Sequence, residues 1–205
     1  MTNADRRHIA IVLDRSGSMQ KVKTDTEGGL AAFLEAQADA PGETTVSLYQ
    51  FDDQYEAVYE NKTLTDVPAY RLVPRGATAL FDAVGRTVNA VGEQLVAQPE
   101  ADRPGEVVVV ILTDGQENAS REFTGQSVKA SVTRQQDNYG WKFVFLGADQ
   151  DAFEAGGSLG IDRDSTLSYV SSNTRASMTA AGRMVSRGTA SGLYAFTDAE
   201  RDATA

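Results

Sequence analysis

The sequence predicts an α/β fold in which a doubly wound, mostly parallel sheet of about six strands is flanked by helices on both faces. Three observations lead to this prediction. Apolar runs alternate along the chain with helical patterns. The run at 106–115 (EVVVVILTDG) is apolar almost throughout, as in a central parallel strand that is covered on both faces. Two runs separated by a short break, 44–52 and 55–60, predict a hairpin and therefore one antiparallel edge strand.

The remaining elements of the first half follow from apolar spacing. Residues 8–14 (HIAIVLD) form a short apolar run that predicts a buried strand. Residues 28–39 combine helix formers with apolar positions at helical spacing, and Pro41 and Gly42 end that pattern. Residues 78–95 place five apolar side chains on one helical face, which predicts a long amphipathic helix.

The second half continues the alternation of helices and strands. The predicted elements are a helix at 125–137, a buried strand at 142–149, a short helix at 152–160, a strand at 165–170 and a helix at 174–188. The last eight residues are polar, and we expect them to be frayed. No linker divides the chain, so we predict a single domain over 1–205, in which 171–205 form a helical extension and a tail.

Composition narrows the classes of function. The formal net charge is −10 and the 19 Lys and Arg residues are scattered, which argues against nucleic acid as a partner. The chain has no cysteine, so a disulfide framework and a thiol nucleophile are excluded. No apolar run is long enough to cross a bilayer, and the first residues do not resemble a signal peptide. We therefore expect a soluble cytoplasmic protein without membrane insertion.

Small oxygen-bearing side chains follow the predicted strands. Asp14, Ser16 and Ser18 come directly after the first strand, and Asp114 closes the most apolar strand. Thr78 opens the long amphipathic helix. In doubly wound sheets ligands bind beyond the carboxyl ends of the strands, so these side chains can reach one rim. Mg²⁺ binds about six oxygens and needs few carboxylates, which suits such a set.

Three segments, VLDRSGSM, GATALFDAV and VILTDGQEN, resemble in this order the loops of a von Willebrand factor A domain with a metal-ion-dependent adhesion site. The resemblance runs from His8 to about Val170. The motif sequences look most like those of stand-alone bacterial or phage members of the family. The resemblance implies a non-enzymatic module, with Mg²⁺ as cofactor and Mn²⁺ or Ca²⁺ as alternatives. The metal-site positions that it implies are Asp14, Ser16, Ser18, Thr78 and Asp114.

The same resemblance implies how such a site would work. The two serines would ligate the ion directly, Thr78 directly or through water, and the two aspartates largely through water. One position would stay open for an Asp or Glu of a partner protein. Members of this group often work beside AAA+ ATPases, in metal-resistance operons or in the assembly of larger complexes. An AAA+ ATPase or a component of a larger assembly is therefore the kind of partner that the resemblance implies, and the sequence does not select between them. For a phage-encoded protein the location would extend to the virion.

Other interpretations of these residues stay open. The main alternative function is Mg²⁺-dependent phosphate or nucleotide binding, or a phosphohydrolase-like activity, and a third is a structural domain with a vestigial site. A Ser-His-Asp hydrolase would need His8, which lies roughly 20 Å from the serines along a strand. Thr78 could be only a helix cap, as could Asp149 and Asp151. For Asp82 we expect a solvated or capping role.

Overall fold

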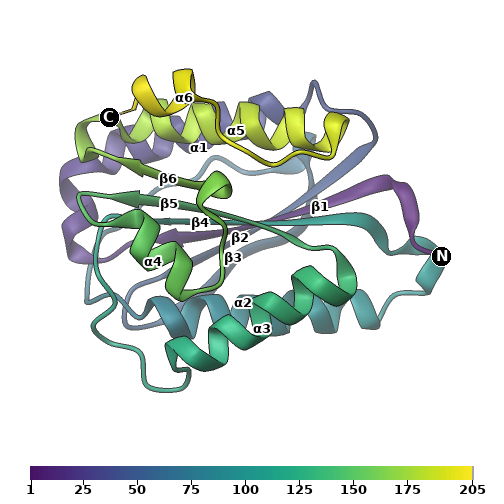
Figure 1. Cartoon of the computed structure of the whole chain (residues 1–205), viewed down its shortest axis with the longest axis horizontal. Helices are drawn as coiled ribbons and strands as arrows, with labels where there is room; N and C mark the ends of the chain where they lie inside the picture. Colours follow the sequence, from purple (N-terminus) through teal and green to yellow (C-terminus); the bar gives the residue numbers. More distant parts are fainter. Residues whose placement is uncertain (205) are drawn as a thin grey trace.

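Six strands form one sheet in which five carboxyl ends lie at the same edge. The structure is a computed structural model that describes residues 1–204. The strands are β1 (Asn3–Asp14), β2 (Glu43–Phe51), β3 (Tyr55–Thr63), β4 (Pro104–Thr113), β5 (Lys142–Ala148) and β6 (Thr166–Tyr169). Their order is β3-β2-β1-β4-β5-β6, and every neighbouring pair is parallel except β2 with β3 (Figure 1).

The position of β1 between β2 and β4 determines which loops meet. Leu13 is paired with Leu112 of β4, and Asp14 is paired with Phe51 of β2. The loops that follow these three strands therefore leave the sheet side by side. Asp14 ends β1 and Asp114 follows β4 directly, so both carboxylates are delivered to the same rim.

Helices cover both faces of the sheet. They are α1 (Lys23–Gln37), α2 (Leu80–Val96), α3 (Gly125–Tyr139), α4 (Ala152–Ser158), α5 (Thr174–Ser191) and α6 (Asp198–Asp202). In Figure 1, α1, α5 and α6 lie above the sheet, and α2 and α3 lie below it. Alternate residues of β1 enter opposite cores: Ile9 and Ile11 pack on the α1 and α5 side, whereas Ala10 and Val12 pack on the α2 and α3 side.

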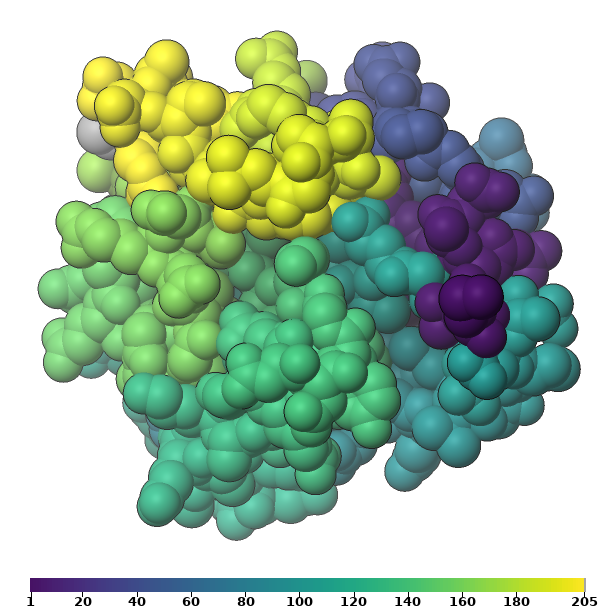
Figure 2. Space-filling view, turned by 45° about the vertical axis from the view of Figure 1, so that its right-hand side comes forward, coloured from purple at the N-terminus to yellow at the C-terminus, as the bar shows by residue number. Residues whose placement is uncertain are grey.

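The amino-terminal edge lies at the other end of the strands. Figure 2 brings this edge forward and shows the first residues (purple) beside the segment near residue 100 (teal). The N-terminal ammonium group forms an ion pair with Glu100, and the Asn3 N–H donates to the Arg103 carbonyl. Because the strands separate the two edges, a ligand at the carboxyl end does not contact this edge.

The predicted fold class is confirmed: the sheet is mixed, mostly parallel and flanked by helices, with β3 as the antiparallel edge strand. β1 begins at Asn3 rather than at residue 8, so it is longer than predicted. α1 begins at Lys23, after a 3-10 segment at Gly17–Val22, rather than at residue 28. No helix within residues 1–204 has the length and apolarity that crossing a membrane requires.

The expectation of a frayed tail is wrong for α6. Thr197 caps this helix by accepting from the Glu200 N–H, and the Glu200 carboxylate accepts from the Thr197 N–H in return. Arg187 of α5 pairs with Glu200 at 2.9 Å, and Arg201 donates to the Thr166 carbonyl of β6. The polar residues thus have specific partners in the fold. Residue 205 lies outside the described part of the chain.

Candidate functional site

The loop after β1 presents two serine hydroxyls at the carboxyl rim. Ser16 is buried, whereas Ser18 is exposed, and their Oγ atoms lie 3.1 Å apart. The Asp14 side chain shapes this loop, because its Oδ1 accepts from the Ser16 N–H at 2.6 Å. The other carboxylate oxygen accepts from the Thr113 hydroxyl of β4, also at 2.6 Å. Asp14 therefore joins the ends of β1 and β4 and orients the two serines.

Asp114 reaches the same cluster from β4. Its Oδ1 accepts from the Ser18 hydroxyl at 2.5 Å. The second oxygen, Oδ2, is buried and has no hydrogen-bond partner among residues 1–204. A buried carboxylate oxygen without a partner is costly, because it has lost water without gaining a donor. This oxygen is consequently available to a cation or to a water bound by one.

Thr78 comes to the cluster from the segment that precedes α2. A Cβ atom built on Gly115 would lie 3.0 Å from Thr78 Oγ1 and 3.7 Å from Ser18 Oγ, so both hydroxyls border one small space. The Thr78 hydroxyl makes no hydrogen bond within the described chain, and its backbone N–H donates to Asn118 Oδ1. Ala79, not Thr78, is the N-cap residue of α2. The interpretation of Thr78 as a helix cap is therefore wrong.

Two buried carboxyl groups make this rim electrostatically unusual. Burial raises the pKa of Asp14 to about 6, and hydrogen bonds from Thr113 and Ser16 oppose that rise while the Asp114 charge adds to it. Burial also raises the pKa of Asp114, with Asp149 adding to the rise and Ser18 and Lys21 opposing it. Both carboxyl groups thus hold their charge at a cost, which a nearby cation would relieve.

The donor set fits a hard cation. Within residues 1–204 no three His, Cys, Asp or Glu side chains are grouped as a metal centre would need, so hydroxyl oxygens must complete any such shell. Ser16, Ser18 and Thr78 supply neutral hydroxyls, and Asp114 supplies the unpartnered oxygen. Oxygen donors of this type suit Mg²⁺ or Ca²⁺ and do not suit metals that prefer sulfur.

Three residues that the sequence did not assign to the site organise the loop after Asp114. Asp82 accepts from the N–H groups of three successive residues, Arg121, Glu122 and Phe123, at 2.8 to 2.9 Å. Burial alone would raise the pKa of Asp82, but these donors outweigh it and lower the pKa. Glu117 accepts from the Phe81 N–H, and Asn118 accepts from Thr78. The solvated or capping role expected for Asp82 is therefore wrong, since this side chain holds the 121–123 loop and the N-caps of α2 and α3 are Ala79 and Thr124.

Other candidates have local or distant roles. Asp151 caps α4 as predicted, accepting from the Glu154 N–H. Asp149 is not a cap, because it accepts from the Ser171 N–H and pairs with Lys21 at 3.0 Å. His8 is buried and lies six residues before Asp14 on the same strand. Its Nδ1 is hydrogen-bonded to Thr45 Oγ1 at 2.9 Å. His8 therefore cannot serve a nucleophile at the carboxyl rim.

Comparison with known proteins assigns the fold to a family. The family model of the von Willebrand factor type A domain matches residues 8–181. Solved structures with this fold include proximal thread matrix protein 1 from the mussel byssus, at TM-score 0.63 and 14% identity, covering 89% of this chain and 47% of that one. The pilus adhesin SpaC from Lactobacillus rhamnosus GG gives TM-score 0.64 and 13% identity, covering 92% of this chain and 31% of that one.

A third structure is similar over nearly its whole length. It is the corresponding domain of the pilus tip protein Mfa5 from Porphyromonas gingivalis, at TM-score 0.62 and 10% identity, covering 90% of this chain and 96% of that one. This chain spans less than half of the mussel protein. No curated protein matches the sequence significantly.

The open, mixed sheet with helices on both faces makes this chain a doubly wound α/β protein, and its polar rim lies at the carboxyl edge, where such sheets bind ligands. The chain belongs to the von Willebrand factor type A family. Domains of this family commonly mediate adhesion and other protein–protein interactions.

Proposed function

We propose that this protein is a non-enzymatic module that binds a partner protein through a divalent cation at the carboxyl rim of the sheet. The residues that would hold the ion are Asp14, Ser16, Ser18, Thr78 and Asp114. The observation that carries the proposal is the convergence of three loops: the Ser18 and Thr78 hydroxyls border one space, and Asp114 contacts Ser18 through Oδ1 while its Oδ2 has no partner within residues 1–204. Mg²⁺ is the cation that we propose, with Mn²⁺ or Ca²⁺ as substitutes.

The residues at the proposed site would have different roles in binding the ion. The three hydroxyls are neutral, so they would leave most of the charge of the ion uncompensated. Asp14 keeps Ser16 in place through the Ser16 N–H, and it binds β4 through Thr113. When bound, the ion would supply a positive centre that an Asp or Glu carboxylate of the partner can join. This local centre would reverse the repulsion that a chain with net charge −10 exerts on an acidic partner.

The first experiment measures cation binding by isothermal titration calorimetry with Mn²⁺ and Mg²⁺. We expect the wild type to bind and Asp14→Ala to lose binding. Asp53→Ala is a matched control, because Asp53 is an exposed carboxylate at the same edge that forms no ion pair within residues 1–204. Equal binding by the wild type and Asp14→Ala, or no binding at all, would refute the proposed site and favour a vestigial one.

The second experiment identifies the ligand class. Peptides that present Glu or Asp, and matched peptides with Gln or Asn, are titrated with Mg²⁺ or with EDTA. We expect Mg²⁺-dependent binding of the acidic peptides alone. Mg²⁺-dependent binding of inorganic phosphate or ATP without binding of any acidic peptide would instead support the phosphate-binding function. An AAA+ ATPase or a component of a larger assembly stays our proposal for the natural partner.

A further inference from the structure

The segment that delivers Thr78 has neither helix nor strand. It comprises residues 67–79 and connects a short 3-10 turn at Leu64–Asp66 to α2. A hydroxyl on such a segment is placed accurately only if tertiary contacts fix the backbone, because no ladder of hydrogen bonds does so. Leu72 provides one anchor, since its side chain is fully buried and its N–H donates to Glu27. That anchor lies six residues before Thr78, so the end of the segment needs another.

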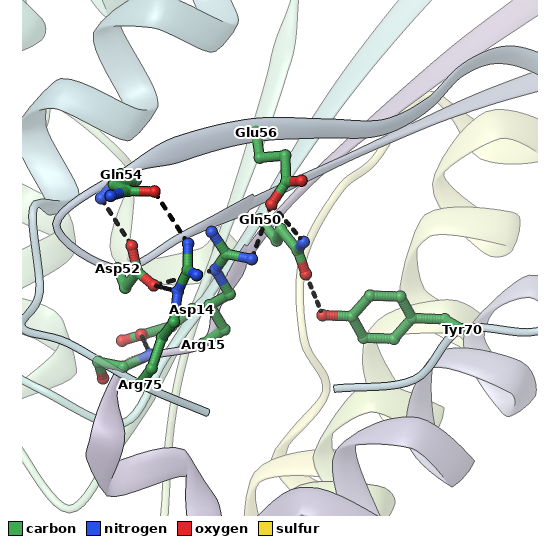
Figure 3. Close-up of polar contacts among 9 residues, drawn as sticks. Asp14, Arg15, Gln50, Asp52, Gln54, Glu56, Tyr70 and Arg75 are labelled. Atoms are coloured by element: carbon green, nitrogen blue, oxygen red, sulfur yellow. Dashed lines mark hydrogen bonds and ion pairs between the residues drawn. The ribbon is translucent and has the colours of Figure 1, made fainter. Parts of the chain in front are cut away.

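Asp52 provides the second anchor. It follows β2 directly, and its side chain is fully buried. Its Oδ2 lies 2.6 Å from Arg75 Nε and 3.1 Å from Arg15 Nε, and its Oδ1 accepts from the Gln54 N–H (Figure 3). The backbone carbonyl of Asp52 accepts from the Ala79 N–H at 2.9 Å. Asp52 thus contacts the end of the 67–79 segment through both its side chain and its backbone.

Arg15 brings the serine loop to the same carboxylate. It lies between Asp14 and Ser16, its side chain is 6% exposed, and Nη1 pairs with Glu56 of β3 at 2.7 Å. Its carbonyl accepts from the Arg75 N–H at 2.8 Å, so the two arginines are joined by backbone as well as through Asp52. In Figure 3 both guanidinium groups lie beside the Asp52 carboxylate. One buried anion therefore connects the loop of Ser16 and Ser18 with the segment of Thr78.

Gly76 shows how closely the two loops approach. Its φ is +69°, and a Cβ atom there would lie 2.4 Å from Asp53 Oδ1 and 3.2 Å from Asp52 Cβ. Its carbonyl accepts from the Gly17 N–H, within the serine loop. Glycine is needed here because other residues adopt this backbone conformation only at a cost and because no side chain fits. The backbone between Arg75 and Thr78 consequently has little freedom while the ion pairs are intact.

We propose that Asp52 and Arg75 are positioning residues that set the cation affinity of the rim without supplying a ligand to it. This inference rests on the proposed function. Asp52 cannot be a ligand itself while both arginines occupy its oxygen, and Arg75 is a cation. Their effect would act through geometry: with the pair intact, Thr78 is held beside Ser18; without it, the end of the 67–79 segment can move away.

Charge and geometry predict opposite effects, which makes the proposal testable. If Arg75 acted only as a positive charge near the site, its removal would strengthen cation binding. If it positions Thr78, its removal weakens binding. Outer residues that orient metal ligands change affinity by about 10- to 100-fold when they are mutated. For Arg75→Gln we expect Mn²⁺ affinity about 10-fold weaker.

The experiment titrates Mn²⁺ into the full chain by calorimetry and records the melting temperature in EDTA. Arg71→Gln is the matched control, because Arg71 is exposed on the same segment and forms no hydrogen bond or ion pair within residues 1–204. We expect Arg71→Gln to bind Mn²⁺ as the wild type does or slightly more tightly. Arg75→Lys should recover part of the affinity, since an ammonium group can still reach Asp52. The variants are made at Arg75 because it is half exposed, whereas replacing the fully buried Asp52 would disturb folding more.

Three outcomes separate this inference from the function on which it rests. Absence of Mn²⁺ binding by the wild type would overturn both. Binding that Asp14→Ala abolishes, together with unchanged or tighter binding by Arg75→Gln, would overturn the positioning role alone. A lower melting temperature of Arg75→Gln in EDTA with unchanged Mn²⁺ affinity would identify the ion pair as purely structural and would also overturn it.

Discussion

Replacing Asp14 with asparagine should stabilise the metal-free protein at neutral pH. The Asp14 side chain is fully buried, and burial raises its pKa from 3.8 to about 6. The shift corresponds to about 3 kcal/mol of unfavourable free energy for the ionised carboxylate in the fold. In the variant, the asparagine Oδ1 can still accept from the Ser16 N–H, and its amide NH₂ group can donate to the Thr113 hydroxyl oxygen. Allowing for weaker hydrogen bonds, we expect a gain of about 1–3 kcal/mol.

The sign of the pH dependence follows from proton binding. Between pH 3.8 and about 6 the folded Asp14 retains a proton that the unfolded chain has lost, so stability falls as pH rises through this window. His8 acts in the opposite direction, because burial lowers its pKa from 6.5 to about 4 and stability is lost as pH falls through that range. The two trends overlap in the wild type. The difference between variant and wild type at each pH isolates Asp14.

Urea unfolding followed by circular dichroism measures this difference. In EDTA the variant should be more stable than the wild type at about pH 7.5 and nearly equal to it at about pH 4. With Mg²⁺ at 100 times its dissociation constant the wild type should gain about 2.7 kcal/mol and the variant much less. A variant that is destabilised in EDTA by the same amount at both pH values would refute the reasoning, because the cost would then not depend on ionisation.

Three further changes test other parts of the structure. Gly115→Ala would place a methyl group 3.0 Å from Thr78 Oγ1, and we expect Mn²⁺ affinity to fall at least about tenfold while the melting temperature in EDTA changes little; unchanged affinity in calorimetry would contradict the site. His8→Gln should remove most of the stability loss between pH 6.5 and about 4, up to about 3 kcal/mol in urea unfolding, and an unaltered pH slope would contradict this. Asp82→Asn should cost about 1–3 kcal/mol, because its amide would face the Arg121 N–H, and hydrogen exchange at residues 121–123 should accelerate; protection equal to the wild type would exclude the loop-holding role.

The elements that the sequence predicts well are those with a strong local signal. Residues 106–115 read as a central strand because both faces of β4 are buried, so nearly every position is apolar. The start of α1 lies five residues before the predicted one, because residues 23–27 (KTDTE) have no apolar side chain and so give no helical spacing. Gly29 lies inside α1 at a close contact with α5, where a Cβ atom would lie 2.8 Å from the Met178 sulfur. That packing requirement comes from a residue far along the chain and has no local signature.

The same limit applies to the rim. Asp14, Ser16 and Ser18 stand at a fixed spacing after a strand, so the sequence alone marks them as a group. Asp52 has the sequence pattern of an ordinary turn residue, and it does accept from the Gln54 N–H as a turn former would. Its ion pairs depend on arginines 37 residues before it and 23 residues after it. No spacing rule connects such positions, and only the folded chain shows them together.

The pairing of α1 with α5 has a consequence for synthesis on the ribosome. β1 and α1 emerge early, but one face of their sheet is covered by Met178, Met184 and Val185 of α5. The Gln37 side chain likewise lacks one of its hydrogen-bond acceptors, the Gly182 carbonyl, until α5 has been synthesised. At about 5–20 residues per second, the first strand is exposed for roughly 10 to 30 s before its cover is made. A nascent chain that pauses before α5 would present a bare apolar surface, which is where chaperones would be expected to bind.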